Sequence, residues 1–157
     1  MRERNRGFTI IEMLIVIAII AVLVGIALPR LRSMQMEGDY AKASGELRTL
    51  QAAVESYYIH NSRAYPAQAT TVSSTWQAVI TPTTVVPNII AAALNDPFST
   101  AGAQYRYATS GTGTSSEYYV IFSLGPNHTA GITGVDTAGA LLGTVGDDIL
   151  VSNGRGF

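Results

Sequence analysis

The sequence predicts an α+β protein, in which one long amino-terminal helix packs against a small antiparallel sheet. Three observations lead to this class. An apolar run follows a short basic head, an apolar stripe at helical spacing comes next, and segments rich in aromatic and β-branched residues fill the carboxyl-terminal half. We expect four parts: the head at 1–7, an apolar helix over 8–28, its amphipathic continuation over 29–63, and a globular domain over 64–157.

The apolar run from Phe8 to Leu28 predicts a membrane-spanning helix. Its 21 residues include one charged side chain, that of Glu12. At about 1.5 Å per residue they extend roughly 31 Å, close to the ~30 Å apolar thickness of a bilayer. A secretory signal peptide is the rival interpretation, but the sequence PRLR follows the run in place of a small-residue cleavage site. The run is therefore expected to stay on the chain as an anchor.

Glu12 lies within the segment that is expected to be surrounded by lipid. A carboxylate costs about 2.5–3.5 kcal/mol near the bilayer centre and less near an interface, so an acid inside a membrane normally has a partner. The apolar run itself contains no cation. One interpretation is that Glu12 reaches the headgroups and only caps the amino end of the helix. The other is that a second molecule supplies the positive charge.

Residues 7–12, Gly-Phe-Thr-Ile-Ile-Glu, resemble the processing site of type IV pilins and of the related pseudopilins of type II secretion systems. The resemblance implies that a prepilin peptidase cuts between Gly7 and Phe8 and methylates the new amino group, so that residues 1–7 are a leader. A glycine before the cut lets the backbone enter a protease cleft closely, and the three leader arginines favour the cytoplasm. The resemblance further implies a single-pass inner-membrane protein whose head is periplasmic or extracellular.

In this family the acid five residues into the mature chain meets the amino terminus of the neighbouring subunit, and Glu12 occupies that place. The resemblance therefore implies a filament of identical copies, with the inner-membrane assembly platform, minor pilins and membrane lipid as further partners. No nucleic-acid partner is expected. Once the leader is removed, seven Lys and Arg stand against ten Asp and Glu, which gives no broad attraction to phosphates.

The amphipathic helix over 29–63 is predicted from steps of four and three between apolar or small residues. They are Met36, Tyr40, Ala43, Leu47, Leu50, Val54 and Tyr57. Most charged side chains of this segment, Glu46 and Glu55 among them, occupy the other positions. We expect the stripe to pack on a sheet, and a parallel coiled-coil dimer is the alternative.

Gly25 and Pro29 predict a helix kink between the two parts of the long helix. Pro29 lacks the amide that would bond to the carbonyl of Gly25, and its ring crowds the same turn. The kink either marks the exit from the membrane or, as pilin filaments suggest, a segment that stretches or melts on packing.

Within the head we expect short helical turns near 76–80 and 88–94 and three strands near 104–107, 118–123 and 148–151, with a turn over 109–116. Three short sequences extend the resemblance to the head of the major pseudopilin: AYP at 64–66, DPF at 96–98 and FSLG at 122–125. The chain has no cysteine. This favours the major pseudopilin over the pilins whose carboxyl-terminal loop is closed by a disulfide.

Relatives of that type often bind calcium in the loop after the Ser-Leu-Gly turn. The resemblance implies a calcium site with ligands drawn from Leu124, Asn127, Asp136, Asp147 and Asp148, since Ca²⁺ takes six to eight oxygen ligands. Here Asn127 stands where an aspartate is usual, and Gly-Asp-Asp replaces the closing Asp-x-Asp, so the affinity is expected to fall. A metal-free, solvated glycine-rich turn is the alternative.

The sequence does not predict an enzyme. It offers two histidines as neutral-pH bases, His60 and His128, and has neither a G-x-S-x-G motif nor a phosphate-binding glycine motif. We expect His60 to contact carbonyls at a helix end. The predicted function is that of a structural subunit, the major pseudopilin of a type II secretion system. The alternatives are a subunit of an extracellular type IV pilus for adhesion, motility or DNA uptake, and a minor tip subunit.

Overall fold

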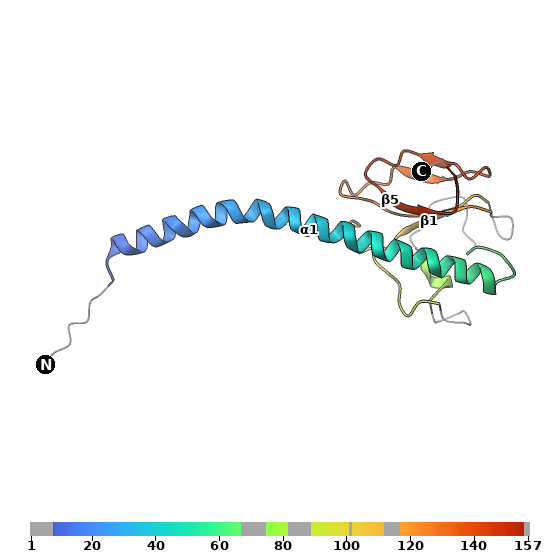
Figure 1. Cartoon of the computed structure of the whole chain (residues 1–157), viewed down its shortest axis with the longest axis horizontal. Helices are drawn as coiled ribbons and strands as arrows, with labels where there is room; N and C mark the ends of the chain where they lie inside the picture. Colours follow the sequence, from blue (N-terminus) through green and yellow to red (C-terminus); the bar gives the residue numbers. More distant parts are fainter. Residues whose placement is uncertain (1–7, 67–74, 82–88, 101, 112–116, 156–157) are drawn as a thin grey trace. The chain divides into compact units, whose positions relative to one another are not determined.

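The computed structural model describes residues 8–66, 75–81, 89–100, 102–111 and 117–155. The predicted leader, including Gly7, lies outside the described residues. The elements are a helix α1 (Ile10–His60), a 3₁₀ turn η1 (Trp76–Val79) and five strands. The chain divides into two compact units, Met1–Gly38 and Asp39–Phe157, which we call the stalk unit and the head unit (Figure 1). Each is described by itself below.

Helix α1 begins and ends at residues whose chemistry accounts for its limits. At the start, the hydroxyl of Thr9 accepts a hydrogen bond from the amide of Glu12, which is the arrangement of a helix N-cap. At the other end Ser62 and Arg63 adopt left-handed backbone conformations, with φ of 52° and 60°. These conformations cannot continue an α-helix. The helix therefore ends at His60, three residues before the predicted limit.

The head unit contains a three-stranded antiparallel sheet with the order β1-β2-β5. Its strands are β1 (Arg106–Thr109), β2 (Tyr119–Ser123) and β5 (Ile149–Ser152). Tyr107 pairs with Ile121, which in turn pairs with Val151 on the other side. The three predicted strands are thus confirmed, with shifts of one or two residues, and the predicted position Gln104 instead forms an isolated bridge with Asn95.

Strand β2 is buried along its whole length because both faces of the sheet are covered. Alternate residues of a strand point to opposite faces. Tyr119 and Ile121 pack with α1 side chains in one apolar cluster, and Val120 and Phe122 pack in a second cluster with Ile132. The second cluster lies under a hairpin of β3 (Ile132–Val135) and β4 (Leu141–Gly143). Within the head unit the hairpin and α1 therefore lie on opposite faces of the sheet (Figure 1).

The structure corrects three details of the sequence-based fold. The predicted stripe is buried from Ala43 to Val54 and half-buried at Tyr57, but Met36 and Tyr40 keep 46% and 38% of their surface exposed. No helix is present in the part of the predicted turn at 88–94 that the structure describes, residues 89–94. The hairpin β3–β4 lies in a stretch for which the sequence predicts a loop. The stretch is rich in glycine and threonine and buries few apolar residues, so it lacks the sequence pattern of a strand.

Candidate functional site

A capping box forms the amino end of α1. The backbone amide and the hydroxyl of Thr9 donate hydrogen bonds of 3.2 and 3.1 Å to the Oε2 atom of Glu12, and the amide of Glu12 donates one of 3.3 Å to the Thr9 hydroxyl. This reciprocal pattern satisfies donors that the first helical turn leaves free. In the isolated chain the carboxylate of Glu12 is therefore held by its own helix. The Thr-x-x-Glu spacing of Thr9 and Glu12 is the sequence pattern of a capping box, but Thr9 was not identified from the sequence as the partner of Glu12.

The other predicted residues of the stalk unit lie on open surface. Phe8, which would become the first residue after cleavage, is 73% exposed. At Gly25 no atom outside its own turn lies within 4 Å of the position that a Cβ would take. The assigned helix continues through Pro29. The kink at Gly25 and Pro29 therefore stays a prediction, and no contact within this unit requires the glycine.

Two carboxylates of α1 bind the hydroxyls of Tyr105, which directly precedes β1, and of Tyr119 in β2. The hydroxyl of Tyr105 donates a 2.7 Å hydrogen bond to Glu46, and that of Tyr119 donates a 2.8 Å hydrogen bond to Glu55. Burial raises the pKa of both phenols well above the ordinary value of 10, and the hydrogen bond from each to its carboxylate raises the pKa further. The sequence had placed Glu46 and Glu55 away from the packed face. The pairing was missed because each bond joins residues about sixty positions apart.

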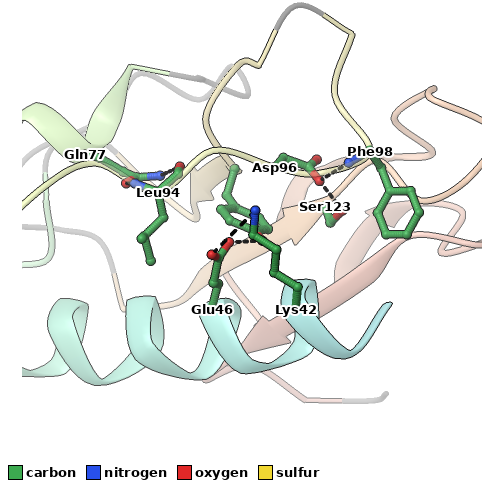
Figure 2. A network of polar contacts seen from close by, with 8 residues as sticks. Lys42, Glu46, Gln77, Leu94, Asp96, Phe98 and Ser123 are labelled. Atoms are coloured by element: carbon green, nitrogen blue, oxygen red, sulfur yellow. Dashed lines mark hydrogen bonds and ion pairs between the residues drawn. The ribbon is translucent and has the colours of Figure 1, made fainter. Parts of the chain in front are cut away.

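Asp96 organises the turn that follows β2. Its Oδ1 atom accepts hydrogen bonds from the amide of Phe98 at 2.9 Å and from the hydroxyl of Ser123 at 2.6 Å. Its Oδ2 atom accepts one from the amide of Leu124 at 2.9 Å. Figure 2 shows Asp96 with Phe98 and Ser123. Asp96 is 2% exposed, and a buried carboxylate is tolerated when hydrogen bonds of this kind satisfy its oxygens. It thereby joins two of the sequences that carried the family resemblance.

The five predicted calcium ligands take part in separate sets of hydrogen bonds. Asn127 and Asp147 contact each other, and Leu124 precedes them at the Asp96 turn. Asp136 accepts the amides of Ala138 and Ala140 inside the β3–β4 turn. Among the described residues no three His, Asp or Glu side chains gather in a metal-binding cluster.

Asp148 lies under this loop and has one free oxygen. Its Oδ2 atom accepts hydrogen bonds from the amides of Gly131 and Ile132 at 2.9 and 3.0 Å, whereas its buried Oδ1 atom has no hydrogen-bond partner among the residues that the structure describes. Burial raises the pKa of the Asp148 carboxyl, and the two amides lower it. One orphaned oxygen beside engaged neighbours falls short of the six to eight ligands that calcium takes. The residues as they stand do not fit the metal.

Both histidines contact backbone carbonyls. The Nδ1 atom of His60 lies 2.7 Å from the carbonyl oxygen of Ser56, as expected for a histidine at a helix end. The Nδ1 atom of His128 contacts the carbonyl oxygen of Phe98. In both cases the contact of the ring nitrogen is to a backbone oxygen.

The fold and the amino-terminal site define a membrane-anchored, pilin-like subunit. Helix α1 is long and apolar enough to cross a membrane, by its length and composition. Residues 2–28 match the prokaryotic N-terminal methylation motif, and residues 30–138 match the family model of type II secretion system protein G. The chain belongs to the type II secretion system protein G family.

Individual relatives agree with this assignment. The chain is 30% identical to the type II secretion system core protein G of Klebsiella pneumoniae over 133 residues, which cover 80% of this chain and 87% of the relative. The protein of the same name from Pectobacterium carotovorum is also 30% identical, with 79% and 78% covered. A type IV major pilin of Myxococcus xanthus is 40% identical over 60 residues, which are 38% of this chain and 27% of that pilin. No solved structure matches the chain.

Proposed function

We propose that this chain is the repeating subunit of the pseudopilus of a type II secretion system. In the assembled filament the apolar parts of the α1 helices bundle into the core, and the heads form the outer surface. The membrane stores the subunits before assembly, and addition of subunits produces the movement that drives secretion. The chain itself carries no chemistry in this account.

One observation carries the proposal, the exposure of the apolar helix. Every described residue from Phe8 to Gly38 is exposed, whereas the head unit has a buried core of its own. The part from Phe8 to Leu28 is apolar apart from Thr9 and Glu12, and an apolar surface of this kind is covered in lipid or by other helices. The described core of the head unit consists of its own residues, and in the proposed account the exposed helix exchanges lipid for copies of itself.

The amino end of α1 supports a specific route into the filament. We infer that the peptidase removes residues 1–7 on the cytoplasmic side, which leaves the head in the periplasm. The new amino group at Phe8 carries a positive charge. It lies four residues before Glu12 and is available to a neighbouring copy, while the Glu12 carboxylate rests in its own capping box. Exchange of these internal bonds for the neighbour's amine gives the Glu12 carboxylate a cationic partner inside the apolar bundle, and this contact fixes the register between subunits.

Photo-crosslinking tests the proposal directly. A benzoylphenylalanine at Leu23, which is 61% exposed, should join processed chains into covalent multimers in membranes of cells that carry the secretion machinery. The same label in a Glu12→Ala background should leave insertion and cleavage intact and yield mostly monomers. Absence of multimers from the parent chain would refute polymerisation. Multimers from both chains would refute only the role of Glu12.

An extracellular type IV pilus is the second candidate. The observation that favours it is the identity with the Myxococcus xanthus type IV major pilin, which is higher than that with the secretion proteins but covers a shorter segment. In both candidates the apolar part of α1 lies in the membrane before assembly and bundles into the filament core afterwards. The place where the fibre accumulates distinguishes them.

A further inference from the structure

The loop between β2 and β5 has a direct link where relatives of this type often hold a metal ion. The backbone amide of Asn127 donates a 2.9 Å hydrogen bond to the Oδ2 atom of Asp147, and its side-chain amide donates to the Oδ1 atom of the same residue. Both oxygens of this carboxylate are therefore engaged by hydrogen atoms of one residue. Such a two-point contact to an ionised acceptor is among the stronger hydrogen-bond arrangements.

The orientation of the Asn127 side chain follows from its second set of contacts. Its Oδ1 atom accepts the backbone amide of Thr129 at 2.6 Å and the Thr129 hydroxyl at 2.7 Å. A backbone amide can only donate, so the atom that it meets must be the amide oxygen of Asn127. The NH₂ group then points at Asp147. Asn127 thus directs donors toward the carboxylate and turns its one potential ligand oxygen away.

The remaining acids of the loop are used for folding. Asp136 binds two amides of its own turn, and Asp148 binds the amides that open β3. Backbone contacts also close the loop tightly, since a Cβ at Gly125 would overlap the carbonyl group of Asp147. The loop is therefore held at both ends without an ion.

We propose that Asn127 replaces a cation in this loop, so that the head folds and holds its Leu124–Asp148 segment independently of calcium. A carboxylate at position 127 would face that of Asp147, and the pair would need a divalent cation between them. One substitution should therefore convert a calcium-independent loop into a calcium-dependent one. Because the inference concerns the folding of the head, it stands or falls independently of filament assembly.

Thermal unfolding of the full chain in detergent micelles, with EGTA or with millimolar CaCl₂, tests the inference. The parent chain should have the same Tm in both solutions. The Asn127→Asp variant should unfold roughly 5 °C lower in EGTA and recover most of this loss in calcium. Asn61→Asp is the matched control, since it makes the same change of charge in the turn after α1, and its Tm should not respond to calcium.

Two results would overturn the inference. A saturable rise in the Tm of the parent chain with calcium would mean that the loop holds the ion despite Asn127. The second result is a parent chain whose Tm does not respond to calcium, together with an Asn127→Asp variant whose Tm calcium does not restore. This result would mean that the Asn127 amide does not occupy the position of a cation. Should Asn127→Asp fail to fold, titration calorimetry of the parent chain with CaCl₂ decides, because a binding isotherm contradicts the inference and its absence supports it.

Discussion

The hydroxyl of Tyr105 donates a 2.7 Å hydrogen bond to Glu46 across 59 positions of sequence, and so joins the start of the sheet to helix α1. Tyr119 and Glu55 form the equivalent link about two and a half helical turns further on. Apolar side chains between the two links complete the contact between helix and sheet. Within the head unit these links hold the sheet and the segment before it to the carboxyl-terminal part of α1.

Removal of the Glu46 carboxylate should lower the free energy of unfolding of the head more than removal of the Tyr105 hydroxyl. Glu46→Ala leaves the largely buried hydroxyl of Tyr105 without its acceptor, and should cost about 1–3 kcal/mol of the free energy of unfolding. Tyr105→Phe leaves Glu46 beside Lys42, at 4.0 Å, and should cost less (Figure 2). Denaturant unfolding of the full chain in detergent measures both, with Arg48→Ala on the exposed side of α1 as control. Equal small losses for all three variants would contradict the role of the link.

The stability of the head should fall above about pH 10. Burial, together with the charge of Glu55, raises the pKa of Tyr65 to about 12, and burial raises the pKa of Tyr105 and Tyr119 in the same direction. A pKa above the unfolded value of about 10 favours the folded state below pH 10, and this contribution is lost as the pH rises through the folded value. Unfolding transitions measured between neutral pH and pH about 12 test the direction of this change in stability. A head that is no less stable at pH about 11.5 would contradict it.

Thr9 should matter for assembly through its hold on Glu12. Thr9→Val keeps the shape of the side chain but removes the hydroxyl that binds Glu12 twice, at a cost of about 0.5–2 kcal/mol for the first helical turn. We expect normal insertion and cleavage with more crosslinked multimers at equal expression, because the Glu12 carboxylate then gives up fewer internal bonds when it meets the neighbour's amine, and a return to the parent level in Thr9→Ser. Multimers at the level of the parent chain would show that the capping box has no part in assembly.

Two glycines in the same loop offer a test of close packing. Gly125 and Gly146 both have positive φ, of 64° and 54°, so alanine strains the backbone at either position. A Cβ at Gly125 overlaps Asp147, whereas nothing lies within 4 Å of one at Gly146. Gly125→Ala should therefore lower the Tm by several degrees more than Gly146→Ala. Equal shifts would mean that backbone strain alone decides.

Most of the fold was predictable because it follows local rules. The apolar run, the helical stripe from Ala43 to Val54 and three strands rich in aromatic and β-branched residues were all expected from spacing and composition. The β3–β4 hairpin was not. It is held by burial against the second face of the sheet, and this is a property of the folded head rather than of the segment.

The candidate site was likewise predictable only where a local sequence pattern marked its residues. Glu12 was singled out from a single charge in an apolar run, and its partner Thr9 could have been found from the Thr-x-x-Glu spacing. The links from Glu46 to Tyr105 and from Asp96 to Ser123 join distant segments. No periodicity reports such pairs, because they depend on the tertiary arrangement.

Quantitative mass spectrometry of sheared surface fibres and of the envelope fraction, from cells that make the chain at its native level, distinguishes a pseudopilus subunit from a surface pilin. We expect a chain that begins with methylated Phe8 and stays overwhelmingly in the envelope. Abundant processed chain in the sheared fibres would contradict the pseudopilus and identify a surface pilin. A chain that still carries residues 1–7 throughout the envelope would contradict processing itself.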